Sequence, residues 1–213
     1  MIRLWCFDLD GTLVDSGDDL TAAVNFMRAT RKLPPLGRNR VLALLGCGRR
    51  MLVERALADA PPFPEAELDE LEKIYEAYYA AHSCDRTRLF PGVPETLSTL
   101  RRRGGRLVLL TNKTASDART ILRKLAADAF FDRVVGDGDG LALKPEPDML
   151  LAVMRQFATP PEETAMVGDN HTDLGAARRA GARAVFARYG FGVTGDETFD
   201  DAIGNFAELE ELR

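Results

Sequence analysis

Hydrophobic positions along the chain fall into two patterns, short continuous runs and longer stretches with helical spacing. The apolar runs cover residues 4–9, 107–110, 133–135, 165–167 and 183–186. Short runs bounded by turn residues are typical of strands that are buried on both faces of a parallel sheet. Helical spacing separates the later runs, over residues 93–103, 115–125, 148–157 and 173–180. This alternation predicts an α/β core with a doubly wound parallel sheet of the Rossmann-like kind.

The segment 16–87 lacks this alternation and shows helical patterns alone. The expected helices are 18–30, 38–45, 49–59 and 65–81. Clusters of proline and glycine, such as Pro34-Pro35 and Gly46-Cys47-Gly48, separate them. We therefore expect a small all-helical cap at 16–87, inserted after the first strand, and a catalytic core formed by 1–15 and 88–213. A cap above the strand ends could close over a substrate.

Composition and charge exclude several classes of protein. The chain is 46% hydrophobic and 29% charged, with a net charge of -5, which is typical of an ordinary globular protein. No cluster of Lys and Arg is dense enough to follow a nucleic-acid backbone. No apolar stretch approaches the length of a membrane span, and the first residues do not resemble a cleavable signal. We expect a cytoplasmic protein that binds neither nucleic acid nor membrane, as a monomer or a homodimer.

Two carboxylates, Asp8 and Asp10, directly follow the first predicted strand. Placing charge at the end of a buried strand is costly unless a partner or a ligand uses it. A calcium-binding loop of the EF-hand kind needs glycine at its sixth position, whereas Gly11 follows Asp10 at once. The pair therefore indicates chemistry other than calcium binding.

Polar residues also follow three later strands. Thr111 and Asn112 precede a predicted helix, Lys144 precedes another, and Asp169 and Asp173 flank the start of a third. Taken singly, these residues could be helix caps or a solvated lysine. The carboxyl ends of parallel strands meet at one edge of a sheet, so together they predict a single site for a phosphate and a metal.

The four segments resemble, in order, the four motifs of the haloacid dehalogenase superfamily, and the similarity covers the whole chain. Features of the cap such as Leu33-Pro34-Pro35 look like those of phosphoglycolate phosphatases. The resemblance implies a Mg²⁺-dependent phosphatase that forms an aspartyl phosphate. It implies that Asp8 is the nucleophile and a metal ligand, and that Asp10 is the general acid and base, with its backbone carbonyl on the metal.

The resemblance also assigns the remaining residues of the motifs. Asp169 is expected to be the other side-chain ligand of the metal, with Asp173 beside it as a weaker or indirect ligand. The transferring phosphoryl group is expected to be bound by Gly11, Thr12, Thr111, Asn112 and Lys144, of which Thr111 and Lys144 also take part in catalysis.

The expected substrate is a small phosphorylated metabolite, with 2-phosphoglycolate first among the candidates. Either Arg49 or Arg50, which follow the loop Gly46-Cys47-Gly48, could bind its carboxylate with two parallel hydrogen bonds, and Arg49 is the first candidate. Pyrophosphate, nucleotides and sugar phosphates remain alternatives.

Three other activities on the same scaffold are less favoured. A sugar-phosphate mutase would need a cap histidine shortly after the first motif, where the chain has Ser16 and Gly17. A phosphonate hydrolase would need a buried cap lysine with a lowered pKa, and neither Lys32 nor Lys73 has an apolar setting. A non-enzymatic binding protein would be expected to lack one of the motif residues, and all are present.

Overall fold

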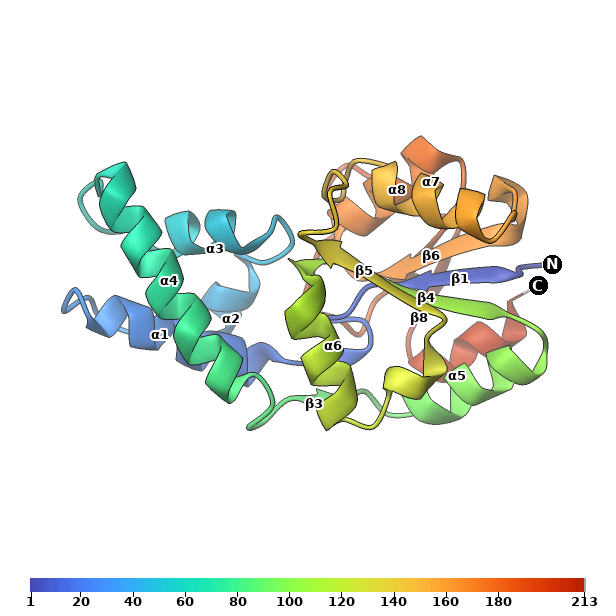
Figure 1. Ribbon diagram of the computed structural model, residues 1–213, viewed down its shortest axis with the longest axis horizontal. Coiled ribbons are helices and arrows are strands. Elements are labelled where there is room, and N and C mark those ends of the chain that lie inside the picture. Colours follow the sequence, from blue (N-terminus) through green and yellow to red (C-terminus); the bar gives the residue numbers. More distant parts are fainter. Residues whose placement is uncertain (213) are drawn as a thin grey trace.

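A computed structural model describes residues 1–212 and contains a six-stranded parallel sheet in the order β5-β4-β1-β6-β7-β8 (Figure 1). Its strands are β1 (Leu4–Phe7), β4 (Arg106–Thr114), β5 (Arg133–Asp137), β6 (Thr164–Gly168), β7 (Arg183–Ala187) and β8 (Asp201–Ile203). All five ladders are parallel. The predicted doubly wound α/β core is confirmed.

The first strand lies at the centre of the sheet, and all four of its residues are buried. Phe7 pairs with Leu109 of β4 on one side and with Val167 of β6 on the other. In this register Phe7, Leu109 and Val167 lie at the same level, and β4 continues beyond it to Thr114. The polar residues that follow them are therefore brought to one edge of the sheet, as expected for parallel strands.

Helices cover both faces of the sheet (Figure 1). Side chains alternate along β1, so that Leu4 and Cys6 pack with α7 (Asp148–Gln156) and α8 (His171–Ala180). Trp5 and Phe7 face the opposite cluster, which includes α5 (Val93–Arg102), α6 (Ala115–Lys124) and the 3-10 helix η3 (Phe206–Glu211). The sheet is thus closed to water on both faces.

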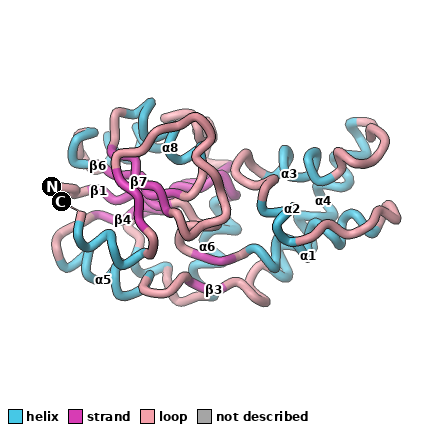
Figure 2. The backbone as a smooth tube through the Cα atoms, turned by 180° about the vertical axis from the view of Figure 1, so that it is seen from behind, coloured by secondary structure: helices cyan, strands magenta, loops and turns pink. Residues whose placement is uncertain are grey.

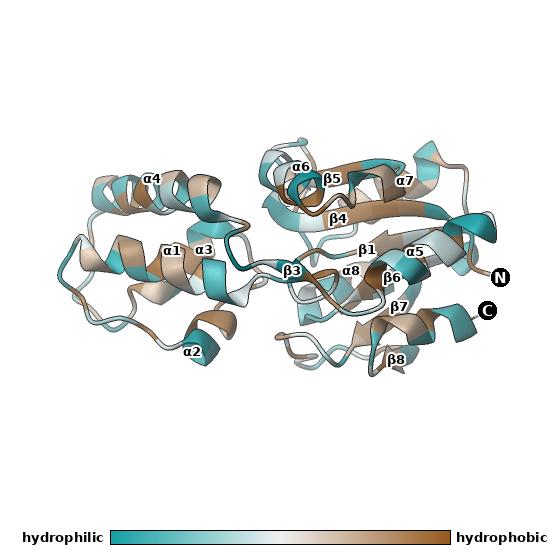
Figure 3. Ribbon diagram, turned by 90° about the horizontal axis from the view of Figure 1, so that it is seen from below, coloured by the Kyte–Doolittle hydropathy of each residue, from teal (hydrophilic) through white to brown (hydrophobic). Residues whose placement is uncertain are grey.

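The remaining four helices pack together beside the sheet, at the end where the active-site loops lie (Figures 1 and 2). They are α1 (Gly17–Ala29), α2 (Arg38–Leu42), α3 (Arg49–Ala56) and α4 (Glu65–His82). Arg28 of α1 is fully buried among them and forms two hydrogen bonds with Asp59, at 2.7 and 2.8 Å. Two short strands, β2 (Val14–Asp15) and β3 (Arg88–Leu89), pair antiparallel where the chain passes between these helices and the sheet (Figure 3).

The eight helices expected from the sequence all occur, with ends that differ by a few residues. The helix expected over 38–45 ends at Leu42, and the one expected over 49–59 ends at Ala56. Strands β2, β3 and β8 were not predicted, because two or three residues are too few to show a repeat. Within residues 1–212, no helix combines the length and apolar character needed to cross a membrane.

Candidate active site

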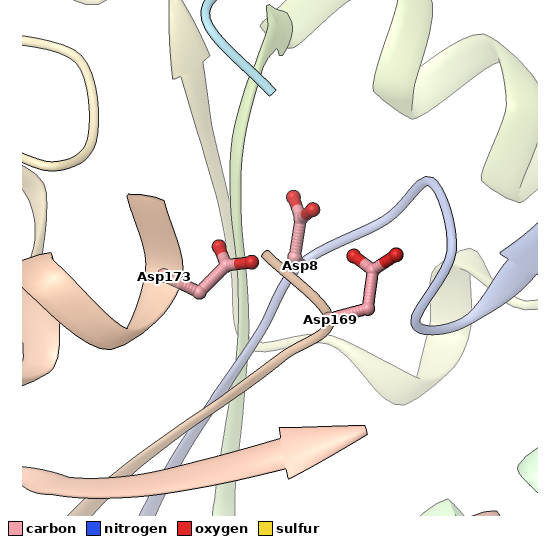
Figure 4. Close-up of side chains that lie close together, drawn as sticks. All are labelled: Asp8, Asp169 and Asp173. Carbon is pink, nitrogen blue, oxygen red and sulfur yellow. The ribbon is translucent and has the colours of Figure 1, made fainter. Parts of the chain in front are cut away.

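Three carboxylates converge at the edge of the sheet where β1 and β6 end (Figure 4). Asp8 follows β1, Asp169 follows β6, and Asp173 lies in the first turn of α8; each offers an oxygen within 4.8 Å of the others. Glycine makes this approach possible. A Cβ atom at Gly11 would lie 2.1 Å from Asp169 Oδ2, and one at Gly168 would lie 2.3 Å from Asp173 Oδ2.

The cluster carries more negative charge than the surrounding protein offsets. Burial raises the pKa of Asp8 to about 6, although the Lys144 ammonium beside it acts in the opposite direction. Burial, together with Asp173 and Asp8, raises the pKa of Asp169 to about 8. A hard divalent cation prefers oxygen ligands of this kind and would offset their repulsion. The donor set therefore fits such a cation.

The raised pKa values predict how the stability of the metal-free protein depends on pH. Both carboxyls bind protons more tightly in the folded chain than in the unfolded chain, where an aspartate has a pKa of about 4. The free energy of unfolding should therefore fall as the pH rises from about 4 through about 8, by on the order of 5 to 10 kcal/mol. Thermal unfolding in a chelator between pH 5 and pH 9 would measure this loss as a decrease of roughly ten degrees or more in the melting temperature.

The matched control for this pH dependence is Asp169→Asn. That variant removes one of the two titrating groups and one buried negative charge, so its melting temperature should depend less on pH. An equally steep dependence in the variant would show that the carboxylate cluster is not its source.

Lys144 is the cation of the cluster, and it is buried rather than solvated. Its Nζ donates to Asp8 Oδ1 at 2.8 Å, to Asp173 Oδ1 at 2.6 Å and to the carbonyl oxygen of Leu110 at 2.8 Å. The second oxygen of Asp173 accepts a hydrogen bond from the backbone of Asn170 at 3.0 Å. Both oxygens of Asp173 thus have protein partners, and its predicted role as a weaker or indirect metal ligand stays a prediction.

Asp10 lies on the cavity wall but outside the cluster of three carboxylates. Its Oδ1 accepts a hydrogen bond from Ser16 Oγ at 2.5 Å, and its Oδ2 lies 3.2 Å from Lys113 Nζ. These contacts hold the carboxyl beside Asp8 without using it to neutralise Lys144. Its predicted role as the general acid and base stays a prediction.

Asn112 lines the cavity, and its predicted contact with the phosphoryl group stays a prediction, because its side chain is already bonded within the protein. Its Oδ1 accepts from the backbone of Lys144 at 2.8 Å, and its Nδ2 donates to the carbonyl oxygens of Lys144 at 2.7 Å and Gly46 at 2.8 Å. Both amide hydrogens are thus used by the protein. Thr111 is better placed, because its Oγ accepts from the backbone of Lys113 at 3.2 Å and keeps its own hydrogen for an anion.

Gly11 and Thr12 form the turn behind Asp10. Gly11 has a φ of +83°, a value that favours glycine. Thr12 is buried and its carbonyl oxygen accepts a hydrogen bond from Tyr189 at 2.8 Å. The residues that line the cavity do not include either of them, so their predicted contact with substrate stays a prediction.

A cavity of about 90 Å³ lies over these groups. The strand ends and loops of the sheet contribute one part of its wall, which includes Asp8, Asp10, Thr111, Asn112, Lys113, Lys144, Asp169 and Phe191. The segment from α1 to α4 contributes the other part, which includes Leu20, Leu42, Leu45, Arg49, Leu52, Tyr75 and Tyr79. Because Asn112 also bonds to Gly46, the helices lie in contact with the site loops. The structure thus encloses the space above Asp8.

Arg49 lies on this wall, as the proposed carboxylate contact requires, but it is paired. Its Nε lies 2.9 Å from Glu72 and its Nη1 lies 2.8 Å from Glu76, both on α4. Two glutamates offset the charge of one guanidinium. The predicted contact between Arg49 and substrate stays a prediction, and a substrate carboxylate would have to compete with both.

Sequence reasoning missed Lys113 and Tyr79 as members of the site. Lys113 adjoins Asn112 at the end of a predicted strand, so its position was a usable signal. Tyr79 sits in a helix of ordinary amphipathic pattern, and nothing in that pattern indicated that it reaches the core.

Comparison with known proteins places the chain in a family. The family described as haloacid dehalogenase-like hydrolase matches residues 5–187. Phosphoglycolate phosphatase 1 of Pseudomonas aeruginosa is 40% identical over 194 residues, which cover 89% of this chain and 70% of the relative. The phosphoglycolate phosphatase of Escherichia coli K12 is 36% identical over 208 residues, covering 89% of this chain and 82% of the relative.

A solved structure agrees with these matches. The crystal structure of a predicted phosphoglycolate phosphatase from Haemophilus somnus is similar with a TM-score of 0.93 and 30% identity, covering 99% of this chain and 97% of that one. The similarity extends over the helices as well as the sheet. The chain belongs to the haloacid dehalogenase-like hydrolase family.

Proposed function

We propose that the protein is a Mg²⁺-dependent phosphatase that hydrolyses 2-phosphoglycolate through a phosphoaspartate on Asp8. The observation that carries the proposal is the position of Asp8 at the floor of an enclosed cavity, bonded to Lys144 and next to Asp10. A carboxylate nucleophile, a cation for the phosphoryl oxygens and a separate proton donor are the groups that this reaction needs.

Mg²⁺ would be held by the side chains of Asp8 and Asp169 and by the backbone carbonyl of Asp10. When bound, it would supply positive charge beside the phosphoryl oxygens and offset their repulsion from Asp8. Asp169 is suited to this role, because its Oδ2 accepts from the backbones of Phe191 and Gly192 at 2.8 Å each, which orients Oδ1.

In the first step, an Asp8 oxygen attacks phosphorus and the bond from phosphorus to the leaving oxygen breaks. Asp10 gives its proton to that oxygen, so that glycolate leaves as the alcohol. Thr111 offers a hydrogen-bond donor to the phosphoryl oxygens. The Lys144 ammonium, which lies beside Asp8, supplies positive charge that offsets the negative charge spreading over these oxygens in the transition state.

In the second step, Asp10 takes a proton from a water molecule that attacks the phosphorus of the phosphoaspartate. The bond between Asp8 and phosphorus breaks, releasing inorganic phosphate and restoring the Asp8 carboxylate. Splitting the reaction in this way replaces one difficult displacement by two easier ones.

The choice of 2-phosphoglycolate is supported by the names of the relatives and by the closed site. A cavity of about 90 Å³ suits a leaving group of a few atoms better than a nucleoside. We also propose that residues 16–87 move as a cap, with β2 and β3 as the crossing points, so that substrate enters when the contact between Asn112 and Gly46 is open. Such a metabolite is handled in the cytoplasm, where we place the activity.

Phosphate release from a panel of substrates tests this proposal. With Mg²⁺, kcat/KM for 2-phosphoglycolate should exceed that for pyrophosphate, a nucleoside monophosphate and a sugar phosphate by at least about tenfold. Removal of metal with a chelator should abolish release, and added Mg²⁺ should restore it. Equal, low rates on the whole panel would contradict the substrate, and full activity in the chelator would contradict the metal dependence.

A further inference from the structure

Lys113 is a cation on the cavity wall to which the mechanism above gives no role. Its side chain is only 10% exposed, and its Nζ donates to Tyr79 Oη at 2.9 Å and lies 3.2 Å from Asp10 Oδ2. The same Nζ lies 4.2 Å from the centre of the Tyr79 ring. The ammonium of Lys113 thus contacts both the hydroxyl of Tyr79 and the carboxyl of Asp10, which is the proposed proton donor.

Lys113 keeps its charge in this setting. Burial alone would lower the pKa of its ammonium, but Asp10 and Tyr75 raise it, and the net direction is upward. An ammonium has three donors, and among residues 1–212 only Asp10 and Tyr79 are polar partners of this one. One donor therefore remains for a ligand.

The other two cations of the cavity wall are engaged more fully. All three donors of Lys144 have partners at the floor of the cavity. The Arg49 guanidinium is flanked by Glu72 and Glu76. Arg49 also has a guanidinium nitrogen without a hydrogen-bond partner, but it lies against two carboxylates. Of the cations that line the cavity in the described chain, Lys113 is the one that combines a spare donor with a single carboxylate in contact.

We propose that Lys113, together with Tyr79, binds the carboxylate of the leaving group and so selects phosphoglycolate. The inference rests on the proposed function and names the residues that bind the carboxylate of its substrate. Asp10 must reach the leaving oxygen, and in phosphoglycolate a single methylene group separates that oxygen from the carboxylate. Since Lys113 Nζ is 3.2 Å from Asp10, one small leaving group can contact both residues.

Tyr79 strengthens this recognition. Its Oη accepts the hydrogen bond from Lys113, so the hydroxyl hydrogen is free to be donated to a carboxylate oxygen. Tyr75 stacks on Tyr79 with ring centres 5.8 Å apart, and Leu20 and Leu52 also line the cavity. These apolar groups exclude water, and a pair of charges attracts more strongly where water is excluded. Because Tyr79 belongs to α4, it can bind the carboxylate only when the cap is closed.

The test compares two substrates that differ only in the group Lys113 would bind. They are 2-phosphoglycolate and 2-hydroxyethyl phosphate, in which a neutral hydroxymethyl group replaces the carboxylate. In Lys113→Met, the ratio of their kcat/KM values should fall on the order of 10²-fold, mainly through a higher KM for phosphoglycolate. Any effect on Asp10 acts on both substrates and cancels in the ratio.

Two further variants make the result specific. Lys113→Arg should restore most of the ratio, because it keeps the positive charge, and Tyr79→Phe should lower it several-fold. Lys73→Met, which removes an exposed lysine from the same helix as Tyr79, should leave it unchanged. Activity on 2-hydroxyethyl phosphate reports that each variant is folded.

A ratio that stays within about threefold of wild type in Lys113→Met would overturn the inference while leaving the proposed function intact. So would a larger fall in Arg49→Met than in Lys113→Met, which would assign the carboxylate to Arg49. A wild-type protein with no preference for phosphoglycolate would overturn the proposed substrate and, with it, the role of Lys113.

Discussion

Asp8→Asn is expected to lower kcat for phosphoglycolate by at least about 10⁴-fold. The amide has nearly the same shape as the carboxylate and can still accept the hydrogen bond from Lys144. It is a poor nucleophile, however, so the phosphoaspartate cannot form. The loss should therefore appear in kcat, whatever the substrate of the panel.

Stability separates this effect from misfolding. Asp8→Asn removes one negative charge from a buried cluster of three carboxylates, so the melting temperature in a chelator should not fall. Steady-state phosphate release and thermal unfolding would be measured on the same preparation. A variant that keeps a tenth or more of the wild-type kcat would exclude Asp8 as the nucleophile.

Lys144→Met should produce the second large effect, on activity and on stability together. Loss of the ammonium removes a donor to the phosphoryl oxygens, and kcat should fall on the order of 10³-fold. It also leaves Asp8 and Asp173 buried without their cation. Breaking a buried pair in this way typically costs about 3 to 5 kcal/mol.

Metal should partly reverse the loss of stability. Thermal unfolding of Lys144→Met would be measured in a chelator and in excess Mg²⁺, and the gain on adding Mg²⁺ should be larger than in wild type. Lys124→Met, at an exposed position at the end of α6, is the matched control and should change stability by less than about 0.5 kcal/mol. An unchanged melting temperature for Lys144→Met in the chelator would contradict the placement of this lysine.

The fold could be predicted from the sequence because five of the six strands of the main sheet are marked by their own composition. Leu4–Phe7 is uniformly apolar and is followed directly by the carboxylate of Asp8. Thr164–Gly168 is buried along its whole length and is followed directly by the carboxylate of Asp169. Parallel pairing then brings the ends of these strands together without further information. Asp8 and Asp169 therefore meet as expected, although 161 positions separate them along the chain.

The orientation of side chains could not be predicted in the same way. Arg49 follows a glycine loop and looked available for a ligand, but its pairing with Glu72 and Glu76 depends on how α3 packs against α4. Asn112 has the right position for a phosphate ligand, and its donors are used by Lys144 and Gly46. Contacts of this kind arise between elements, and the pattern within one element does not specify them.

The contacts around the proposed binding position of the leaving group could not be predicted from the sequence either. The contact of Lys113 with Tyr79 joins the end of β4 to α4. Tyr79 has no distinctive setting in its helix, and the position of Lys113 at a strand end does not indicate which residue it contacts. Their pairing follows only from the closed arrangement of the helices over the strand ends, which places the proposed recognition of substrate at the boundary between them.

The most direct test of the account is to trap the covalent intermediate. Wild-type protein would be mixed with phosphoglycolate labelled in its phosphate and with Mg²⁺, quenched in acid within one turnover, digested and analysed by mass spectrometry. The account predicts a labelled phosphoryl group on the peptide that contains Asp8, labile to hydroxylamine and absent from Asp8→Asn. Label on another residue, or phosphate release that continues in Asp8→Asn, would contradict it.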